Sequence, residues 1–205
     1  KSSVGLLVTK AEVHSVTLLP KGFSTLGGRD VWFDRDVLRL NYNEQGEYLG
    51  SFHARDRILI VLTSGECYTT DFSDSIHIEE NLLRIEKNEP RKIWTAVYYD
   101  ADQKYHYIKR FSIEEDQKRE NILGENPKNE LLLLTDTYYP RLVIGRKEKD
   151  GELRTVEIDV EEFALVKSIR ARGKRIAPYP IDQVEELAPM KPSPTFEEEH
   201  AEEMR

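Results

Sequence analysis

The sequence predicts an all-β protein built from repeated hairpins in a propeller-like arrangement, and three observations favour this class. Apolar residues recur through most of the chain with a period of two, which is the period of a strand. The apolar runs begin near residues 4, 58, 93, 131 and 163, so similar units follow one another. A spacing of about 35–50 residues, with several strands in each unit, is typical of blade architectures.

The first two hairpins are expected in the N-terminal third of the chain. VGLLVTKAEVHSVTL (4–18) alternates like a hairpin. A Gly-rich ordered loop, the apolar VWF and a turn at 44–46 are expected to follow within residues 21–52. ILIVLT (58–63) and CYTTDF (67–72) are two β-rich runs around a turn with Gly65 at its tip, which indicates a second hairpin.

Further strand pairs are expected in the second half. Residues 93–111 are similar, with a longer polar turn from Asp100 to Lys104, and residues 131–145 form a third pair of runs. RTVEIDV (154–160) and FALVKSI (163–169) have the pattern of two more strands. A helical pattern is weak everywhere and is considered only at the start of 181–187. A β-sandwich could use the same strands, so closure into a ring stays open at this point.

The chain divides into a predicted folded domain, residues 1–190, and a predicted disordered acidic tail, residues 191–205. Five prolines interrupt regular structure from Pro178 onward. The tail holds two cations against five glutamates, a net charge of −3 within the total of −8. A net acidic chain argues against nucleic acid as a partner, so a nucleic-acid interface must depend on a local basic face.

The remaining composition favours a cytosolic protein without a membrane segment. Cys67 is the single cysteine, so no internal disulfide is possible, and its place in an apolar alternation predicts a buried side chain rather than a nucleophile. No run approaches the roughly 18 apolar residues of a membrane helix. The chain begins at Lys1, and we expect it to be a piece of a longer protein.

Cations concentrate in KSIRARGKR (167–175), which contains no acid, and secondly at residues 104–110. Gly173 predicts a bend that fans its neighbours toward solvent, and phosphates favour such clusters through counterion release. A solvated surface loop explains the first cluster equally well, and cross-strand packing explains the tyrosines of the second better than base stacking does. The candidate DNA contacts are Lys21, Arg29, Lys104, Lys109, Arg110, Lys167, Arg170, Arg172, Lys174 and Arg175.

Motifs for catalysis, metal binding and nucleotide binding are absent from the sequence. GxGxxG, GxxxxGK[ST], GxSxG, HExxH and DxDxDG do not occur, and the five histidines lack metal-ligand spacing. We therefore expect no catalytic, metal or cofactor residues in this chain.

Several segments, taken in order, resemble the C-terminal β-pinwheel domain of type IIA topoisomerase A subunits, the subunits of gyrase and topoisomerase IV. DRILIVLTSGECYTTDF (56–72) is similar to the family's blade core, and NELLLLTDTYYPRLVIG (129–145) repeats that core with Tyr138-Tyr139 in place of the turn glycine. VEEFALVKSIRARGKRI (160–176) resembles the last blade. STLGGRDVWFD, LNYN and GEYLGSF, within 24–52, resemble one branch of topoisomerase IV.

The resemblance implies a pinwheel of four or five blades, either a closed or an open ring, that binds and bends duplex DNA without catalysing a reaction. The cleavage core of the same A subunit, the ATPase B subunit, ATP and Mg would belong to other parts of an ATP-dependent enzyme at the cytoplasmic nucleoid. The gyrase box Gln-Arg-Arg-Gly-Gly-Lys-Gly is absent, and KGFSTLGGR (21–29) is at most a remnant, so relaxation and decatenation of the topoisomerase IV type are favoured. We expect the isolated domain to be a monomer. A protein-interaction propeller and a small-ligand enzyme on a β scaffold are the alternatives.

Overall fold

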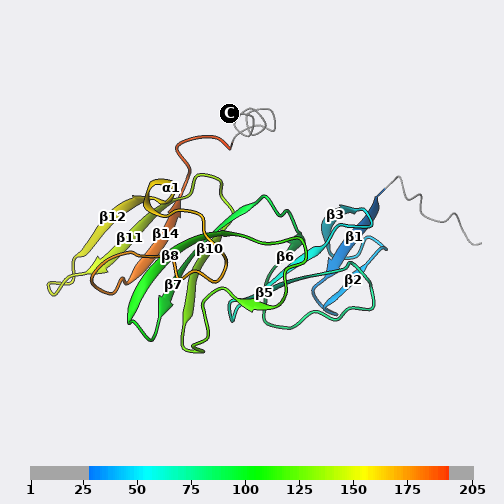
Figure 1. Ribbon diagram of the computed structural model, residues 1–205, viewed down its shortest axis with the longest axis horizontal. Coiled ribbons are helices and arrows are strands. Elements are labelled where there is room, and N and C mark those ends of the chain that lie inside the picture. The colour runs from blue at the N-terminus through cyan, green and yellow to red at the C-terminus, as the bar shows by residue number, and fades with distance from the viewer. Residues whose placement is uncertain (1–27, 194–205) are drawn as a thin grey trace, which may run out of the picture.

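The computed structural model describes residues 28–193, and its regular structure is almost entirely antiparallel strand (Figure 1). The strands form four sheets, none of which closes into a barrel. The all-β prediction is therefore confirmed. The hairpin expected at 4–18 lies outside the described residues, as does most of the acidic tail. A bilayer-spanning helix is absent from residues 28–193, where the one α-helix has four residues.

The four sheets begin one after another along the chain. Sheet A has the order β2-β1-β3, from β1 (Arg29–Asp34), β2 (Arg39–Asn41) and β3 (Glu47–Phe52). Sheet B has the order β6-β4-β5-β9, from β4 (Ile58–Leu62), β5 (Glu66–Thr70), β6 (Leu82–Lys87) and β9 (Glu120–Asn121). Sheet C has the order β10-β7-β8-β13, from β7 (Ile93–Asp100), β8 (Tyr105–Ser112), β10 (Glu130–Thr135) and β13 (Lys174–Arg175). Sheet D has the order β12-β11-β14, from β11 (Arg141–Lys147), β12 (Leu153–Asp159) and β14 (Gln183–Leu187).

Each sheet repeats one connection pattern. A hairpin comes first, and its first strand then pairs with a later strand of the same unit: β1 with β3, β4 with β6, β7 with β10 and β11 with β14. The chain between the hairpin and that later strand reaches back to the preceding sheet. There His77 bridges Arg39 of β2, β9 pairs with β5, and β13 pairs with β8. We call these three pieces lent strands. Sheet D receives none from residues 28–193, so β12 keeps one unpaired edge.

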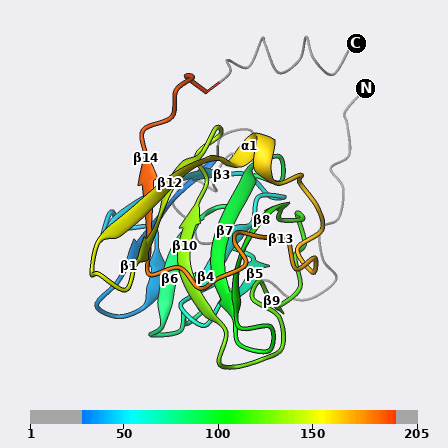
Figure 2. The same ribbon diagram turned by 90° about the vertical axis from the view of Figure 1, so that its left-hand side faces the viewer.

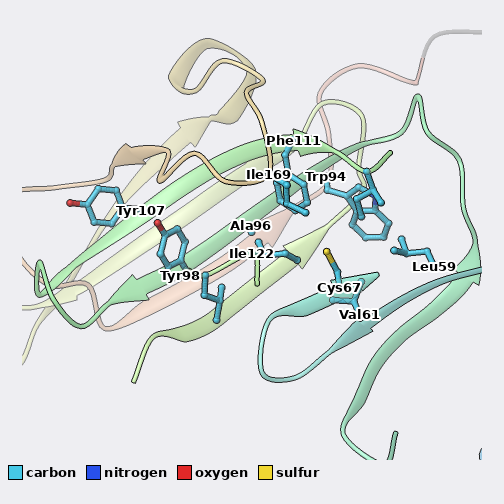
Figure 3. Close-up of a cluster of buried hydrophobic side chains, with 12 residues drawn as sticks. Leu59, Val61, Cys67, Trp94, Ala96, Tyr98, Tyr107, Phe111, Ile122 and Ile169 are labelled. Carbon is cyan, nitrogen blue, oxygen red and sulfur yellow. The ribbon is translucent and has the colours of Figure 1, made fainter. Parts of the chain in front are cut away.

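The sheets lie in a row from A to D, and a separate apolar core fills each of the three gaps (Figure 1). Strand β4 shows the result: Ile58, Ile60 and Leu62 pack toward sheet A, while Leu59 and Val61 pack toward sheet C. All five residues are buried because both faces of sheet B are covered. The core between sheets B and C contains Trp94, Tyr98 and Phe111 of sheet C, and Ile169 of the chain that leads to β13 (Figure 3).

Three sequence-based expectations were wrong. Residues 131–145 are not a hairpin: β10 completes sheet C, whereas β11 begins sheet D, and their apolar side chains pack in different cores. Residues 163–169 are not a strand, because Asp159 caps α1 (Val160–Phe163) by accepting from the amides of Glu161 and Glu162. Val166 then forms only an isolated bridge. Residues 183–187 are strand β14, not a helix start, because they pair with β11.

An ion-pair network joins sheets B and C beside Trp94. Lys92 Nζ lies 2.6 Å from Glu86 Oε1 and 3.0 Å from Asp136 Oδ2. Arg84 bridges the same two carboxylates at 2.8 and 3.0 Å. Burial raises the pKa of Asp136, but the hydrogen bond from Lys92 and the charges of Arg84 and Lys92 outweigh it, so the pKa lies below its ordinary value. The ionised carboxylate is thus part of the folded state.

Asp136→Asn is expected to lower the free energy of unfolding by about 1–2 kcal/mol at pH 7, because two charge-assisted bonds are weakened. Since the folded-state pKa is depressed, this stabilisation is complete above the unfolded-state pKa and is lost as the pH falls below about 4. Urea titrations at pH 7 and pH 3 measure both effects. The matched control is Asp116→Asn, which weakens the exposed pair with Arg57 and should cost about 0.5 kcal/mol or less. Equal losses in both variants would contradict a structural role for the network.

Candidate nucleic-acid interface

The basic segment, residues 167–175, lies along the outer edge of sheet C beside β8 (Figure 2). The amide of Lys167 donates to the carbonyl of Arg110 over 2.9 Å. Further along, Lys174 and Arg175 pair with Ile108 and Tyr107 as β13, one of the lent strands. The segment is therefore hydrogen-bonded to β8 at both of its ends, which holds it as an ordered loop.

Gly173 makes this attachment possible, as the sequence suggested. Its φ is +92°, in the left-handed region that side chains disfavour. A Cβ there would lie 2.3 Å from the carbonyl oxygen of Ile108 and 2.7 Å from Cβ of Lys109. The bend therefore needs glycine for two reasons, its backbone conformation and its close approach to β8.

Three cations of the basic segment are exposed and have no carboxylate within 4 Å in the described part of the chain: Lys167, Lys174 and Arg175. Lys174 Nζ lies 4.4 Å from the centre of the Phe163 ring, and the guanidinium of Arg175 lies 4.7 Å from that of Tyr105. Cation–π contacts of this kind orient a charge while leaving it open to a further anion.

Arg170 and Arg172 are exposed but already form ion pairs. Arg170 Nη2 lies 2.5 Å from Glu120 Oε1 on β9, and Arg172 Nε lies 3.1 Å from Oδ2 of the buried Asp100. The hydrogen bond from Arg170 lowers the pKa of Glu120 below its ordinary value. A phosphate that bound these two guanidinium groups would compete with carboxylates, so their contribution is smaller than the sequence suggested.

Lys109 and Arg110 do not lie on the exposed surface. Lys109 Nζ donates to the carbonyls of Ile122 and Ile169 at 2.7 and 2.5 Å, and burial lowers its pKa to about 8. Arg110 is also buried, on the other face of β8, where Nη1 donates to the carbonyl of Ala164 over 3.3 Å. The alternation of β8 sends the two side chains into different gaps between sheets, so neither lies on the outer surface of the domain.

The remaining three candidates lie outside this segment. Lys104 is exposed in the β7–β8 turn with a φ of +59°. The next residue is Tyr105, whose ring contacts the guanidinium of Arg175. Arg29 lies on β1, at the opposite end of the row of sheets in Figure 1, with its guanidinium 3.1 Å from the centre of the Tyr42 ring. Lys21 lies outside the described residues. The ten sequence candidates therefore do not form one face.

The aromatic residues near these cations pack within the fold, as the cross-strand interpretation predicted. Tyr98 and Tyr107 are register partners, stack at 5.8 Å and are buried (Figure 3). The Tyr98 hydroxyl donates to the carbonyl of Arg172 over 2.7 Å, which ties the basic segment to β7. Cys67 is buried as predicted, and burial raises the pKa of its thiol to about 12.

Two features of the site were missed by sequence reasoning. The acids that pair with the arginines, Glu120 and Asp100, lie 50 and 72 residues before their partners, and nothing in their local sequence marks them. A pocket of about 480 Å³ between them is lined by Tyr98, Asp102, Asn129 and Arg172 among others, so this side of the segment is mixed in charge. In residues 28–193, no three His, Cys, Asp or Glu side chains form a group that could hold a metal ion.

Comparison with known proteins gives one match. Residues 39–188 match the family model described as "Topoisomerase C-terminal domain, Bacteroidota". The matched range runs from β2 to the end of β14 and includes the whole basic segment. No curated protein and no solved structure matches the chain significantly.

Proposed function

The chain belongs to the topoisomerase C-terminal domain family of Bacteroidota, and from this premise we propose that it is a non-catalytic domain that binds and bends duplex DNA. The basic segment is the proposed DNA contact, and the observation that carries the proposal is how this segment is held and which of its side chains are exposed. An ordered loop, fixed to β8 at both ends, presents Lys167, Lys174 and Arg175 to solvent without carboxylate partners in the described residues. Contacts of this kind fix a duplex in place and read little of its sequence.

The four sheets support the finer proposal of a four-bladed pinwheel with an open ring. Each unit has the same connection pattern. Two units lend the strands β9 and β13 to the sheet before them, and the unit of sheet B lends a single bridge at His77 to sheet A. Sheets A and D lie at opposite ends of the row in Figure 1. DNA that bound across the edges of several sheets would contact more than one of them, which is the proposed origin of bending.

The family assigns the domain to a topoisomerase, and the absence of a gyrase box favours the A subunit of a topoisomerase IV-like type IIA enzyme. In this proposal the cleavage core of the same subunit and the ATPase B subunit are its partners. ATP and Mg act in those parts, and the enzyme acts on the chromosome in the cytoplasm. The domain itself is proposed to be a monomer that positions one duplex.

Replacing Lys167, Lys174 and Arg175 together with alanine tests the proposal. The variant should bind every duplex sequence more weakly, and the slope of log affinity against log salt should decrease by up to about 2.7, because each phosphate contact contributes about 0.9. Duplex titrations at several salt concentrations measure the slope, and circular dichroism shows whether the variant folds. Arg172 is left intact because its loss would strand the buried Asp100.

The matched control is the double variant Lys147→Ala/Lys149→Ala, which removes two exposed cations at the β11–β12 turn. This control should keep the wild-type slope. If the folded triple variant also kept that slope, the basic segment would not be the DNA contact.

A protein-interaction module is the second candidate, and the unpaired edge of β12 favours it. Leu153 and Val156 on this strand are 43% and 57% exposed, and an exposed strand edge with apolar side chains is a template for a further strand. A wild-type domain that showed no salt-dependent duplex affinity would favour this function over DNA binding.

A further inference from the structure

A second pocket, of about 360 Å³, lies on the other side of the basic segment. Its walls come from the end of α1 and the loop after it, from the basic segment and from β8. The lining residues used below are Arg110, Glu162, Phe163, Lys167, Gly173 and Lys174. We call this hollow the Arg110 pocket.

Arg110 is the unusual residue of this pocket. The residue is 7% exposed, yet no carboxylate lies within 4 Å of its guanidinium among residues 28–193. Nη1 has one acceptor, the carbonyl of Ala164, and the buried Nε has none in the same range. An unpaired buried charge is costly, and a buried polar group without a partner calls for an explanation such as a bound ion.

The neighbours of Arg110 give the pocket an excess of positive charge. Lys167 and Lys174 stand at its mouth, both exposed and without carboxylate partners in the described residues. Lys109 also lines the pocket, but its ammonium group is engaged by two carbonyls toward sheet B. Three available cations thus face one acid, Glu162. Guanidinium and ammonium groups together are suited to a phosphate, whose several oxygens accept from each of them.

We propose that the Arg110 pocket binds a phosphate group, with Arg110 at its floor and Lys167 and Lys174 at its mouth. This inference rests on the proposed function, because the phosphate it assigns is one backbone phosphate of the bound duplex. The other source of the same chemistry is a free phosphate or phosphate monoester. A seated phosphate would fix the duplex at one point along the basic segment, where exposed lysines alone allow sliding.

The test compares wild type with Arg110→Met, which keeps an apolar stem in the buried space and removes the charge. Without phosphate, in chloride buffer, Arg110→Met should unfold at the same urea concentration as wild type or a higher one, because it removes an unpaired buried charge. Inorganic phosphate at fixed ionic strength should stabilise the wild type and leave the variant unchanged. Duplex affinity should decrease about tenfold in the variant, the loss of one charge-assisted contact.

Arg146→Met is the matched control. Arg146 is a half-buried arginine of β11 whose guanidinium lies 4.3 Å from the centre of the Tyr179 ring, away from the Arg110 pocket. This variant should keep both the stabilisation by phosphate and the duplex affinity of the wild type.

Three results would be contrary. If phosphate left the wild type unchanged and Arg110→Met unfolded more easily in chloride, Arg110 would be a structural residue and the site would be refuted. If phosphate stabilisation required Arg110 but duplex affinity did not, the pocket would bind a free phosphate and the backbone assignment would be overturned. If the wild type bound no duplex at all yet kept its phosphate stabilisation, the proposed function would fail while the phosphate site stood.

Discussion

Gly173→Ala is expected to detach the basic segment from sheet C and to lower the free energy of unfolding by about 3 kcal/mol or more. The left-handed backbone at φ +92° accounts for about 1 kcal/mol of this loss. The larger part comes from the close approach to β8, where the new Cβ would overlap the carbonyl of Ile108 and Cβ of Lys109. Both residues are buried, so β8 cannot move away, and the segment must give up its pairing instead.

Gly151→Ala provides a matched control for the conformational part. Gly151 has a φ of +86°, and a Cβ there would meet nothing within 4 Å. This substitution should cost only about 1 kcal/mol. Urea unfolding gives both values, and the folded fraction of Gly173→Ala should also bind duplex DNA more weakly. Equal costs at the two glycines would mean that the segment adapts, and that its register against β8 is not fixed.

The second prediction concerns how the stability of the wild type relative to Lys109→Met changes with pH. Between pH 7.5 and 9.5, the free energy of unfolding of the wild type should rise by about 2 kcal/mol relative to that of the variant. Burial lowers the pKa of Lys109 from 10.5 to about 8 in the folded state. The unfolded chain therefore binds the proton more tightly, and stability attributable to Lys109 rises with pH across this window. The neutral amine has two hydrogens, enough to keep its bonds to the carbonyls of Ile122 and Ile169.

The stability of the variant is subtracted from that of the wild type because Cys67 changes the stability of both proteins with pH, in the direction opposite to Lys109. Burial raises the pKa of its thiol from 9.0 to about 12, so the contribution of Cys67 to stability falls above pH 9 in both proteins. Urea titrations at half-unit intervals of pH give the two curves. Lys128→Met, at an exposed lysine, should run parallel to the wild type. Parallel curves for Lys109→Met as well would show that Lys109 is not desolvated in the folded state.

The parts of the fold that sequence predicts are those determined by neighbouring residues. The hairpins β4–β5 and β7–β8 were predicted because both strands and their turn lie within one short segment. The pairing of β10 with β7 could not be predicted in the same way, because the competing partner β11 has an equally apolar pattern and lies closer in sequence. Lent strands of two residues, such as β9 and β13, are too short to show a period.

The same distinction applies to the site. The bend at Gly173 and the exposure of Lys174 and Arg175 were predicted from a local run of cations around a glycine. The burial of Lys109 and Arg110 was not, because alternation along β8 shows that they face opposite ways but not that both faces are covered. That cover comes from sheets B and D, whose residues are distant in sequence.

The lent strands also determine the order in which the protein is completed during synthesis. A ribosome releases the units from N- to C-terminus, and each lent strand belongs to the unit after the sheet that it completes. Sheet B is therefore incomplete until β9 emerges, and β9 is synthesised after the β7–β8 hairpin of sheet C. In the same way, sheet C is incomplete until β13 emerges, after the β11–β12 hairpin of sheet D. Co-translational folding should lag one unit behind elongation, and a chain released early would end in a sheet with an exposed edge, a substrate for proteases and a nucleus for aggregation.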